Sequence, residues 1–181
     1  GASNWVNYGS STSVTFNNNL PQGSITFQVR AIDSAGNVDS TPASVTWTID
    51  TIAPNTTITS APSGTVASTS ATIKYSSSES GGYYQWQIAA SNWINWSSSS
   101  FSFTNLPQGS ITFQVRAVDS AGNVDGSPAT VTWTVDTVAP SVPSLSSPAN
   151  GTYTNDTTPS FSWGGVSGAN LYQIQIDNNS D

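Results

Sequence analysis

The sequence predicts an all-β protein made of tandem antiparallel β-sandwich modules with a period of about 86–88 residues. Two observations carry this prediction. Apolar and polar side chains alternate in several short runs, and one long segment recurs almost unchanged further along the chain. No run shows the 3.6-residue periodicity of an amphipathic helix, so no helical layer is expected.

The clearest strand prediction lies at residues 111–117, where Ile111, Phe113, Val115 and Ala117 alternate with polar side chains. The same period of two recurs at residues 71–75, 84–88, 101–103 and 131–135. Alternation of this kind places the apolar side chains on one face of an antiparallel sheet, where they pack over a core. We therefore expect two sheets packed face to face, with six or seven strands in each module.

A segment of 36 residues occurs twice, at residues 19–54 and at residues 105–140. Thirty of its 36 positions are identical, and the six differences are conservative exchanges or surface replacements such as Ser40 against Gly126. Self-similarity at a fixed period is typical of repeat proteins, in which each unit packs against its neighbours.

Weaker likeness extends the repeat on both sides, because residues 2–5 match residues 90–93 and residues 172–176 resemble residues 84–88. The chain therefore divides into three parts. These are the C-terminal part of one module (1–52), a complete module (53–138) and the N-terminal part of a third module (139–181).

Turn signals separate the predicted strands. Leu106-Pro107-Gln108-Gly109 suits a turn in which proline presets φ and glycine accepts a positive φ. Gly122 and Asn123 are expected to form the hairpin turn between two long strands. The linker Asp136-Thr137-Val138-Ala139-Pro140 is short and contains proline, so it should be semi-rigid and the modules should form an extended rod.

Three segments resemble bacterial immunoglobulin-like and fibronectin type III-like repeats: residues 113–125 (FQVRAVDSAGNVD), 133–140 (WTVDTVAP) and 146–163 (SSPANGTYTNDTTPSFSW). The resemblance covers nearly the entire chain. It implies an immunoglobulin-like sandwich and a place in surface adhesins, stalks or the spacers of secreted polysaccharide-degrading enzymes. One fold hosts many functions, so the resemblance is specific for the fold alone. Domains of this kind often carry a cysteine pair, and this chain has no cysteine.

The charge and composition exclude several classes of function. The net charge is −7 and only three residues are basic, so the chain has no cationic surface for nucleic acid or for an anionic membrane. No apolar stretch is long enough for a spanning helix, so no membrane insertion is expected. The chain has no His or Cys, and Glu79 is its only Glu. A nucleophilic serine would therefore lack its usual base, and we expect a protein that is not an enzyme.

Acidic and amide side chains recur in the repeat in a pattern that suits a calcium ion, which takes six to eight oxygen ligands. A cluster at the hairpin close to a linker aspartate would bind the ion and stiffen the joint between modules. The alternative is that these side chains only cap backbone N–H groups in the turns. No other cofactor is expected. The candidate ligands are Asp33, Asn37, Asp39, Asp50, Asp119, Asn123, Asp125 and Asp136.

Two further surface features suggest carbohydrate. Trp93 and Trp96 lie in a polar segment where they could stack on a sugar ring, and the alternative is that Trp93 only covers the edge of the sandwich. N-x-[ST] triplets, the acceptor pattern for N-glycosylation, begin at Asn55, Asn95, Asn150, Asn155 and Asn178.

The residues expected to matter are structural: Trp86 and Trp133 in the core, Gly122 in the hairpin and Pro140 at the joint. The expected function is a non-catalytic repeat of an extracellular or cell-surface protein that forms a rod for adhesion, spacing or filament building. The alternatives are a filament protomer assembled by strand complementation between copies and a spacer of a secreted polysaccharide-degrading enzyme. Its expected partners are neighbouring copies of the module and surface or matrix glycans or proteins.

Overall fold

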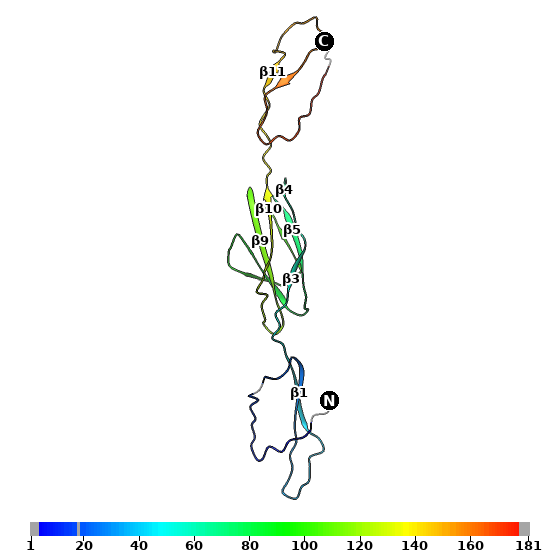
Figure 1. Cartoon of the computed structure of the whole chain (residues 1–181), viewed down its shortest axis with the longest axis vertical. Helices are drawn as coiled ribbons and strands as arrows, with labels where there is room; N and C mark the ends of the chain where they lie inside the picture. The colour runs from blue at the N-terminus through cyan, green and yellow to red at the C-terminus, as the bar shows by residue number, and fades with distance from the viewer. Residues whose placement is uncertain (1–3, 18, 178–181) are drawn as a thin grey trace.

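The computed structural model describes residues 4–17 and 19–177 as an elongated chain with three parts arranged end to end (Figure 1). The N-terminal part contains β1 (Gly23–Val29) and β2 (Ala43–Ile49), and the C-terminal part contains β11 (Leu145–Ser147) and β12 (Ser162–Trp163). The described residues form strands and no helix, so none of them forms a helix long and apolar enough to cross a membrane. The all-β prediction is confirmed for this part of the chain.

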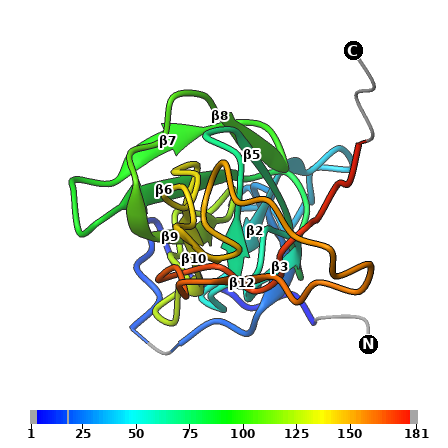
Figure 2. The same cartoon turned by 90° about the horizontal axis from the view of Figure 1, so that it is seen from above.

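Two sheets form a β-sandwich in the middle of the chain, which we call the middle sandwich (residues 55–135). One sheet has five strands in the order β4-β10-β9-β6-β7, and the other has three in the order β3-β5-β8. Viewed along the long axis, β6 and β9 lie on one side and β3 and β5 on the other (Figure 2). The strands are β3 (Thr56–Ser60), β4 (Thr65–Val66), β5 (Ala71–Ser77), β6 (Tyr83–Ile88), β7 (Ile94–Trp96), β8 (Ser100–Phe103), β9 (Gly109–Val118) and β10 (Ala129–Val135).

The core of the middle sandwich is aromatic and lies between the two sheets. The Trp86 ring lies 4.3 Å from the Phe101 ring and 6.1 Å from the Phe113 ring, measured between centroids. Aromatic side chains bury large areas and gain from tilted or edge-to-face contacts. All of the other core residues except Leu106, which lies in the turn before β9, follow the alternation predicted from the sequence; they are Ala71, Ile73, Tyr75, Leu106, Ile111, Val115, Trp133 and Val135.

The two copies of the repeated segment form the same antiparallel hairpin. β1 pairs with β2 in the register Ile25↔Trp47, and β9 pairs with β10 in the equivalent register Ile111↔Trp133, 86 residues later. A Thr–Thr hydroxyl pair joins the polar faces of both hairpins, between Thr26 and Thr46 at 2.9 Å in the first and between the equivalent threonines at 3.1 Å in the second. The hairpin is therefore a property of the segment itself.

Burial differs between the copies although their sequences agree. Phe113 and Trp133 are fully buried, whereas the equivalent Phe27 and Trp47 are half-buried. The three-stranded sheet that covers β9 and β10 has no counterpart over β1 and β2 among the described residues. A hairpin of two strands alone is marginally stable in water, and among the described residues the N-terminal part lacks the contacts with a second sheet that stabilise the middle sandwich.

Candidate functional site

The repeated D-x-x-G-N-x-D segment forms a tight turn that its own side chains hold together. Asp119 Oδ1 accepts hydrogen bonds from the backbone N–H groups of Ala121 and Asn123, each at 2.8 Å. Gly122 has φ +95°, a conformation that favours glycine. Burial opposes the ionisation of Asp119, but the hydrogen bonds from Asn123, Ala121 and Gly122 outweigh it and lower the pKa of Asp119. The turn-capping alternative therefore describes much of what these side chains do.

Asp125 ties the hairpin to the opposite sheet. Its buried carboxylate accepts hydrogen bonds from the Thr56 backbone N–H at 2.8 Å and from the Ser127 N–H at 2.8 Å. Thr56 Oγ1 in turn accepts a 2.7 Å hydrogen bond from the Ala117 N–H. Burial opposes the ionisation of Asp125, but the bonds from Ser127 and Thr56 outweigh it and lower the pKa of Asp125. The equivalent Asp39 is exposed, and among the described residues its carboxylate accepts hydrogen bonds only from Thr41.

A glutamine in each LPQG turn holds the linker that follows the hairpin. Gln22 Oε1 accepts a 3.1 Å hydrogen bond from the Thr51 N–H, and the Gln22 amide also donates to the Thr51 hydroxyl. Gln108 and Thr137 repeat both contacts. Sequence reasoning missed this role for the glutamines. The available signal was the identical 29-residue spacing between glutamine and linker threonine in both copies.

One side chain joins the linker of the first repeat to the middle sandwich. Asn123 Nδ2 donates to the Asp50 carbonyl oxygen at 3.1 Å and to Asp119 Oδ2 at 2.8 Å. The equivalent Asn37 donates to Asp33 at 2.7 Å. The turn of one repeat thus receives the linker of the repeat before it.

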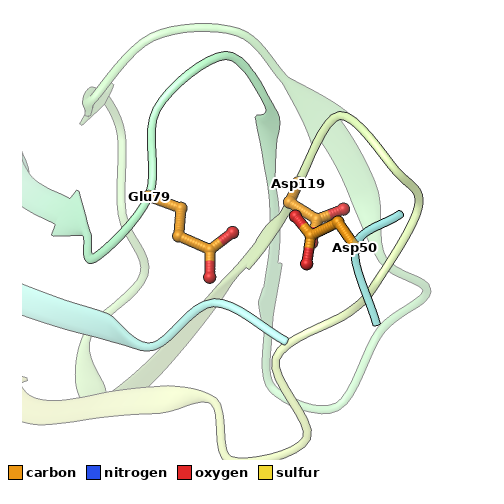
Figure 3. A group of neighbouring side chains, drawn as sticks. All are labelled: Asp50, Glu79 and Asp119. Atoms are coloured by element: carbon orange, nitrogen blue, oxygen red, sulfur yellow. The ribbon is translucent and has the colours of Figure 1, made fainter. Parts of the chain in front are cut away.

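Three carboxylates meet at this joint. Asp50, Glu79 and Asp119 each bring an oxygen within 4.8 Å of the others, and the Glu79 carboxylate points toward the two aspartates (Figure 3). Glu79 lies on the loop after β5. Gly82 fixes this loop against β9, because a Cβ at Gly82 would lie 2.0 Å from the Val118 carbonyl oxygen. Burial and the nearby charges of Asp50 and Asp119 raise the pKa of Glu79.

The structure does not bring the predicted calcium ligands of one repeat together at one place. Asp50 lies next to Asp119 of the following repeat, whereas Asp136 follows β10 at the opposite end of the β9–β10 ladder. The Asp125 carboxylate instead accepts hydrogen bonds from Thr56 and Ser127. Glu79 was not among the predicted ligands but lies in the cluster.

The predicted ligands of the first repeat, Asp33, Asn37 and Asp39, lie in the N-terminal hairpin. Asn37 donates hydrogen bonds to Asp33, and Asp39 accepts one from Thr41. Hard oxygen ligands at a joint suit calcium, and calcium binding stays a prediction.

The tryptophans of the predicted sugar platform have partners within the chain. The Arg116 guanidinium carbon lies 4.1 Å from the centroid of the Trp93 ring, and Arg30 repeats the arrangement over Trp5 at 4.0 Å. Such cation–π contacts occupy one face of each indole. Trp96 packs edge-on against Phe101 at 4.9 Å between centroids.

The remaining predicted positions lie as follows. Trp86 and Trp133 are in the core, and Pro140 is exposed in the linker. The side chains of the glycosylation candidates Asn55, Asn95, Asn150 and Asn155 are exposed, and Asn178 lies outside the described residues.

Comparison with known proteins identifies no family. The sequence matches no protein-family profile and no curated protein. Among solved structures, the chain is similar to the extracellular domain of a putative hybrid two-component system from B. thetaiotaomicron, at 13% identity and a TM-score of 0.37. That similarity covers 63% of this chain and 15% of the other. The chain therefore spans a small part of the length of the protein that it matches.

The Asp125 bridge predicts a loss of stability that depends on pH. Asp125→Ala leaves the buried Thr56 N–H without its acceptor and should destabilise the middle sandwich by about 1–3 kcal/mol at neutral pH. Because the pKa of Asp125 is lowered in the folded state, its contribution is present above pH 3.8 and is lost as pH falls through the folded-state pKa. Urea denaturation at pH 7 and near pH 3 checks this. Asp39→Ala is the matched control and should leave the transition of the middle sandwich unchanged, because Asp39 bonds to Thr41 within the N-terminal part. An equal loss in both variants would contradict the bridge.

The carboxylate cluster predicts that Glu79→Gln stabilises the protein at neutral pH without divalent ions. The raised pKa means that ionised Glu79 is disfavoured in the folded state, so the benefit of glutamine should vanish in acid, where Glu79 is protonated in both states. The measurement is the thermal midpoint at several pH values, with Asp177→Asn as a control for charge alone. A lower midpoint for Glu79→Gln at neutral pH would contradict this account.

The calcium prediction is tested with the same two proteins. If calcium binds here, millimolar calcium should raise the thermal midpoint of the wild type above that of Glu79→Gln. An unchanged wild-type midpoint would show the calcium prediction to be wrong.

Proposed function

We propose that this chain is a non-catalytic structural repeat of an extracellular or cell-surface protein, and that its modules form an extended rod for adhesion, spacing or filament building. The observation that carries the proposal is the joint between the first repeat and the middle sandwich. There the linker is held on one side by Gln22 and on the other by Asn123. A linker bound on both sides transmits the direction of one module to the next, which is what a rod requires.

The composition supports the same function. The chain lacks His and Cys, and three of its carboxylates gather at the joint. Its surface is rich in Ser, Thr and Asn and weakly charged. Four aromatic side chains of the middle sandwich, Tyr75, Trp86, Phe113 and Trp133, are buried in its core. Each of these features suits a mechanical element.

The rod proposal predicts that Asn123 restricts the angle between the first two parts. Asn123→Ala removes the contact with the Asp50 carbonyl and should broaden the distribution of distances between the N-terminal hairpin and the middle sandwich. Because the chain has no cysteine, spin labels on Gln28→Cys and Thr72→Cys can report this distance by electron paramagnetic resonance. Asn37→Ala is the matched control, because it loses the same turn contact without any contact to the middle sandwich. A wild-type distribution as broad as that of Asn123→Ala would contradict a stiff joint.

A further inference from the structure

The sheet face that points away from the core of the middle sandwich has a polar centre with one charged side chain. Side chains alternate along β6 and β9, so Trp86 and Val115 face the core and their neighbours point outward. The chain has 10 acidic residues, and none of them lies at this centre. The outward side chains at the centre, which we call the outer face, are Gln85, Gln87, Asn95, Gln114, Arg116 and Thr130.

Hydrogen bonds between neighbouring strands hold the outer face in one arrangement. Gln87 Nε2 donates to Gln114 Oε1 at 2.6 Å, and Gln114 Nε2 donates to Thr130 Oγ1 at 3.2 Å. A carboxamide has two N–H donors and an oxygen with two lone pairs, so this row leaves donors and acceptors over. A ligand that lies on the face therefore meets amides that are already oriented, which lowers the entropic cost of binding.

Arg116 is held from two sides within the outer face. Its Nε donates to Gln85 Oε1 at 2.8 Å, and Gln85 Nε2 donates to Asn95 Oδ1 at 3.0 Å. Its guanidinium carbon lies 4.1 Å from the centroid of the Trp93 ring. The two terminal nitrogens of Arg116 have no hydrogen-bond acceptor among the described residues. Arg116 is thus fixed in place with its terminal N–H groups available.

The placement of the basic residues points to an anionic ligand group at this position. The chain has a net charge of −7 and only three basic residues. Two of these, Arg30 and Arg116, occupy equivalent positions of the repeat, and each lies over a tryptophan. A carboxylate is the group that a planar guanidinium binds with two parallel hydrogen bonds. The outer face is therefore complementary in charge to a ligand that carries carboxylates.

The outward glutamines recur in the third part of the chain, although the core residue between them changes. Residues 172–176 (YQIQI) repeat residues 84–88 (YQWQI) with one difference, which replaces the core residue Trp86 with isoleucine. Packing alone would favour keeping the core residue rather than its outward neighbours. The recurrence therefore suits a role of the outward glutamines themselves, and repeated contacts of this kind suit a long ligand.

A shallow hollow beside β7 adjoins the outer face. Tyr83, Asn95, Trp96 and Ser97 line it, and its volume is about 310 Å³. Tyr83 is 37% exposed and Trp96 is 39% exposed. An exposed aromatic ring beside amides and hydroxyls fits a sugar ring, because a sugar presents apolar C–H groups on its faces and hydroxyls around its rim.

We propose that the outer face binds a polysaccharide that carries carboxylates, such as a chain of uronic acid sugars, laid across β6, β7 and β9. Arg116 binds a carboxylate with its terminal nitrogens, and Gln87 and Gln114 bind hydroxyls of neighbouring sugars. A further sugar ring lies in the hollow against Tyr83. Repulsion by the net charge is screened beyond about 8 Å at physiological ionic strength. This ligand class rests on the extracellular function proposed above and gives the rod a target for adhesion.

The first test is binding of the full 181-residue chain to the polyuronates polygalacturonate, alginate and hyaluronate, measured by isothermal titration calorimetry. We expect at least one of them to bind. Methyl esterification of its carboxylates should weaken the affinity about tenfold or more, because it removes a charge-assisted hydrogen bond and keeps the sugar backbone. Polyglutamate, which presents carboxylates on a peptide, should bind about tenfold more weakly than the polyuronate, because it lacks the sugar hydroxyls.

The second test removes the cation. Arg116→Gln should lower the affinity for the polyuronate about tenfold or more. Lys74→Gln is the matched control, because it removes the same charge from an exposed side chain of β5 in the opposite sheet, and it should bind like the wild type. Arg116→Lys keeps the charge without the planar fork, so it should recover only part of the affinity.

The third test changes the glutamine row and leaves Arg116 in place. Gln87→Glu adds a negative charge to the outer face and should abolish binding to the polyuronate. Thr72→Glu adds the same charge to an exposed position of β5 and should leave binding unchanged. Circular dichroism and the thermal midpoint check that each variant is folded.

Binding to none of the polyuronates would overturn this site. So would equal losses in Arg116→Gln and Lys74→Gln, which would show an effect of net charge alone, or equal binding of polyglutamate, which would show that carboxylates suffice without sugars. No binding together with a stiff joint in the distance measurement would remove the ligand site and leave the rod function in place. Binding together with a flexible joint would do the reverse.

Discussion

Covering one apolar sheet face with another is the interaction on which the rest of this structure depends. Phe113 and Trp133 are buried because the three-stranded sheet lies over β9 and β10. Full burial of a large apolar side chain stabilises a fold by about 1.5–3 kcal/mol, so a face with several such residues decides whether the hairpin is stable. The first copy has almost the same sequence and the same register, and it lacks this cover among the described residues. The repeated segment therefore specifies a hairpin, and only its context makes that hairpin part of a core.

The hydrogen-bond partners of the polar side chains also depend on which segments lie beside each hairpin. Asp125 can be ionised and buried because the Thr56 N–H from the opposite sheet reaches it, whereas the equivalent Asp39 has no such partner in the described part of the chain and is exposed. Asn123 likewise differs from Asn37 because a linker passes beside it. Identical residues thus acquire different roles from their neighbours. At the joint, the cluster of Asp50, Glu79 and Asp119 concentrates negative charge where two parts of the chain meet, and burial together with this charge raises the pKa of Glu79.

Much of the fold could be predicted from the sequence, and the site only in part. The alternation at Ile111, Phe113 and Val115 identified β9 and its buried face, because period two is local information. The hairpin turn at Gly122 followed from the residue types that a positive φ requires. The sequence did not predict that Glu79 lies in the carboxylate cluster. Its position depends on the contact of Gly82 with Val118, a tertiary contact that no local pattern encodes. The meeting of Asp50 with Asp119 of the next repeat was missed for the same reason, and so was the hold of Gln22 on the linker.

The most direct test of the central claim is hydrogen exchange of the two hairpins in one sample of the 181-residue chain. Because the sequences agree at 30 of 36 positions, intrinsic exchange rates largely cancel and differences in protection report the covering sheet. The account predicts that amides of β9, such as that of Phe113, exchange on the order of a hundredfold more slowly than those of β1, such as that of Phe27. Equal protection in the two hairpins would show that the segment is stable without its cover and would contradict the account.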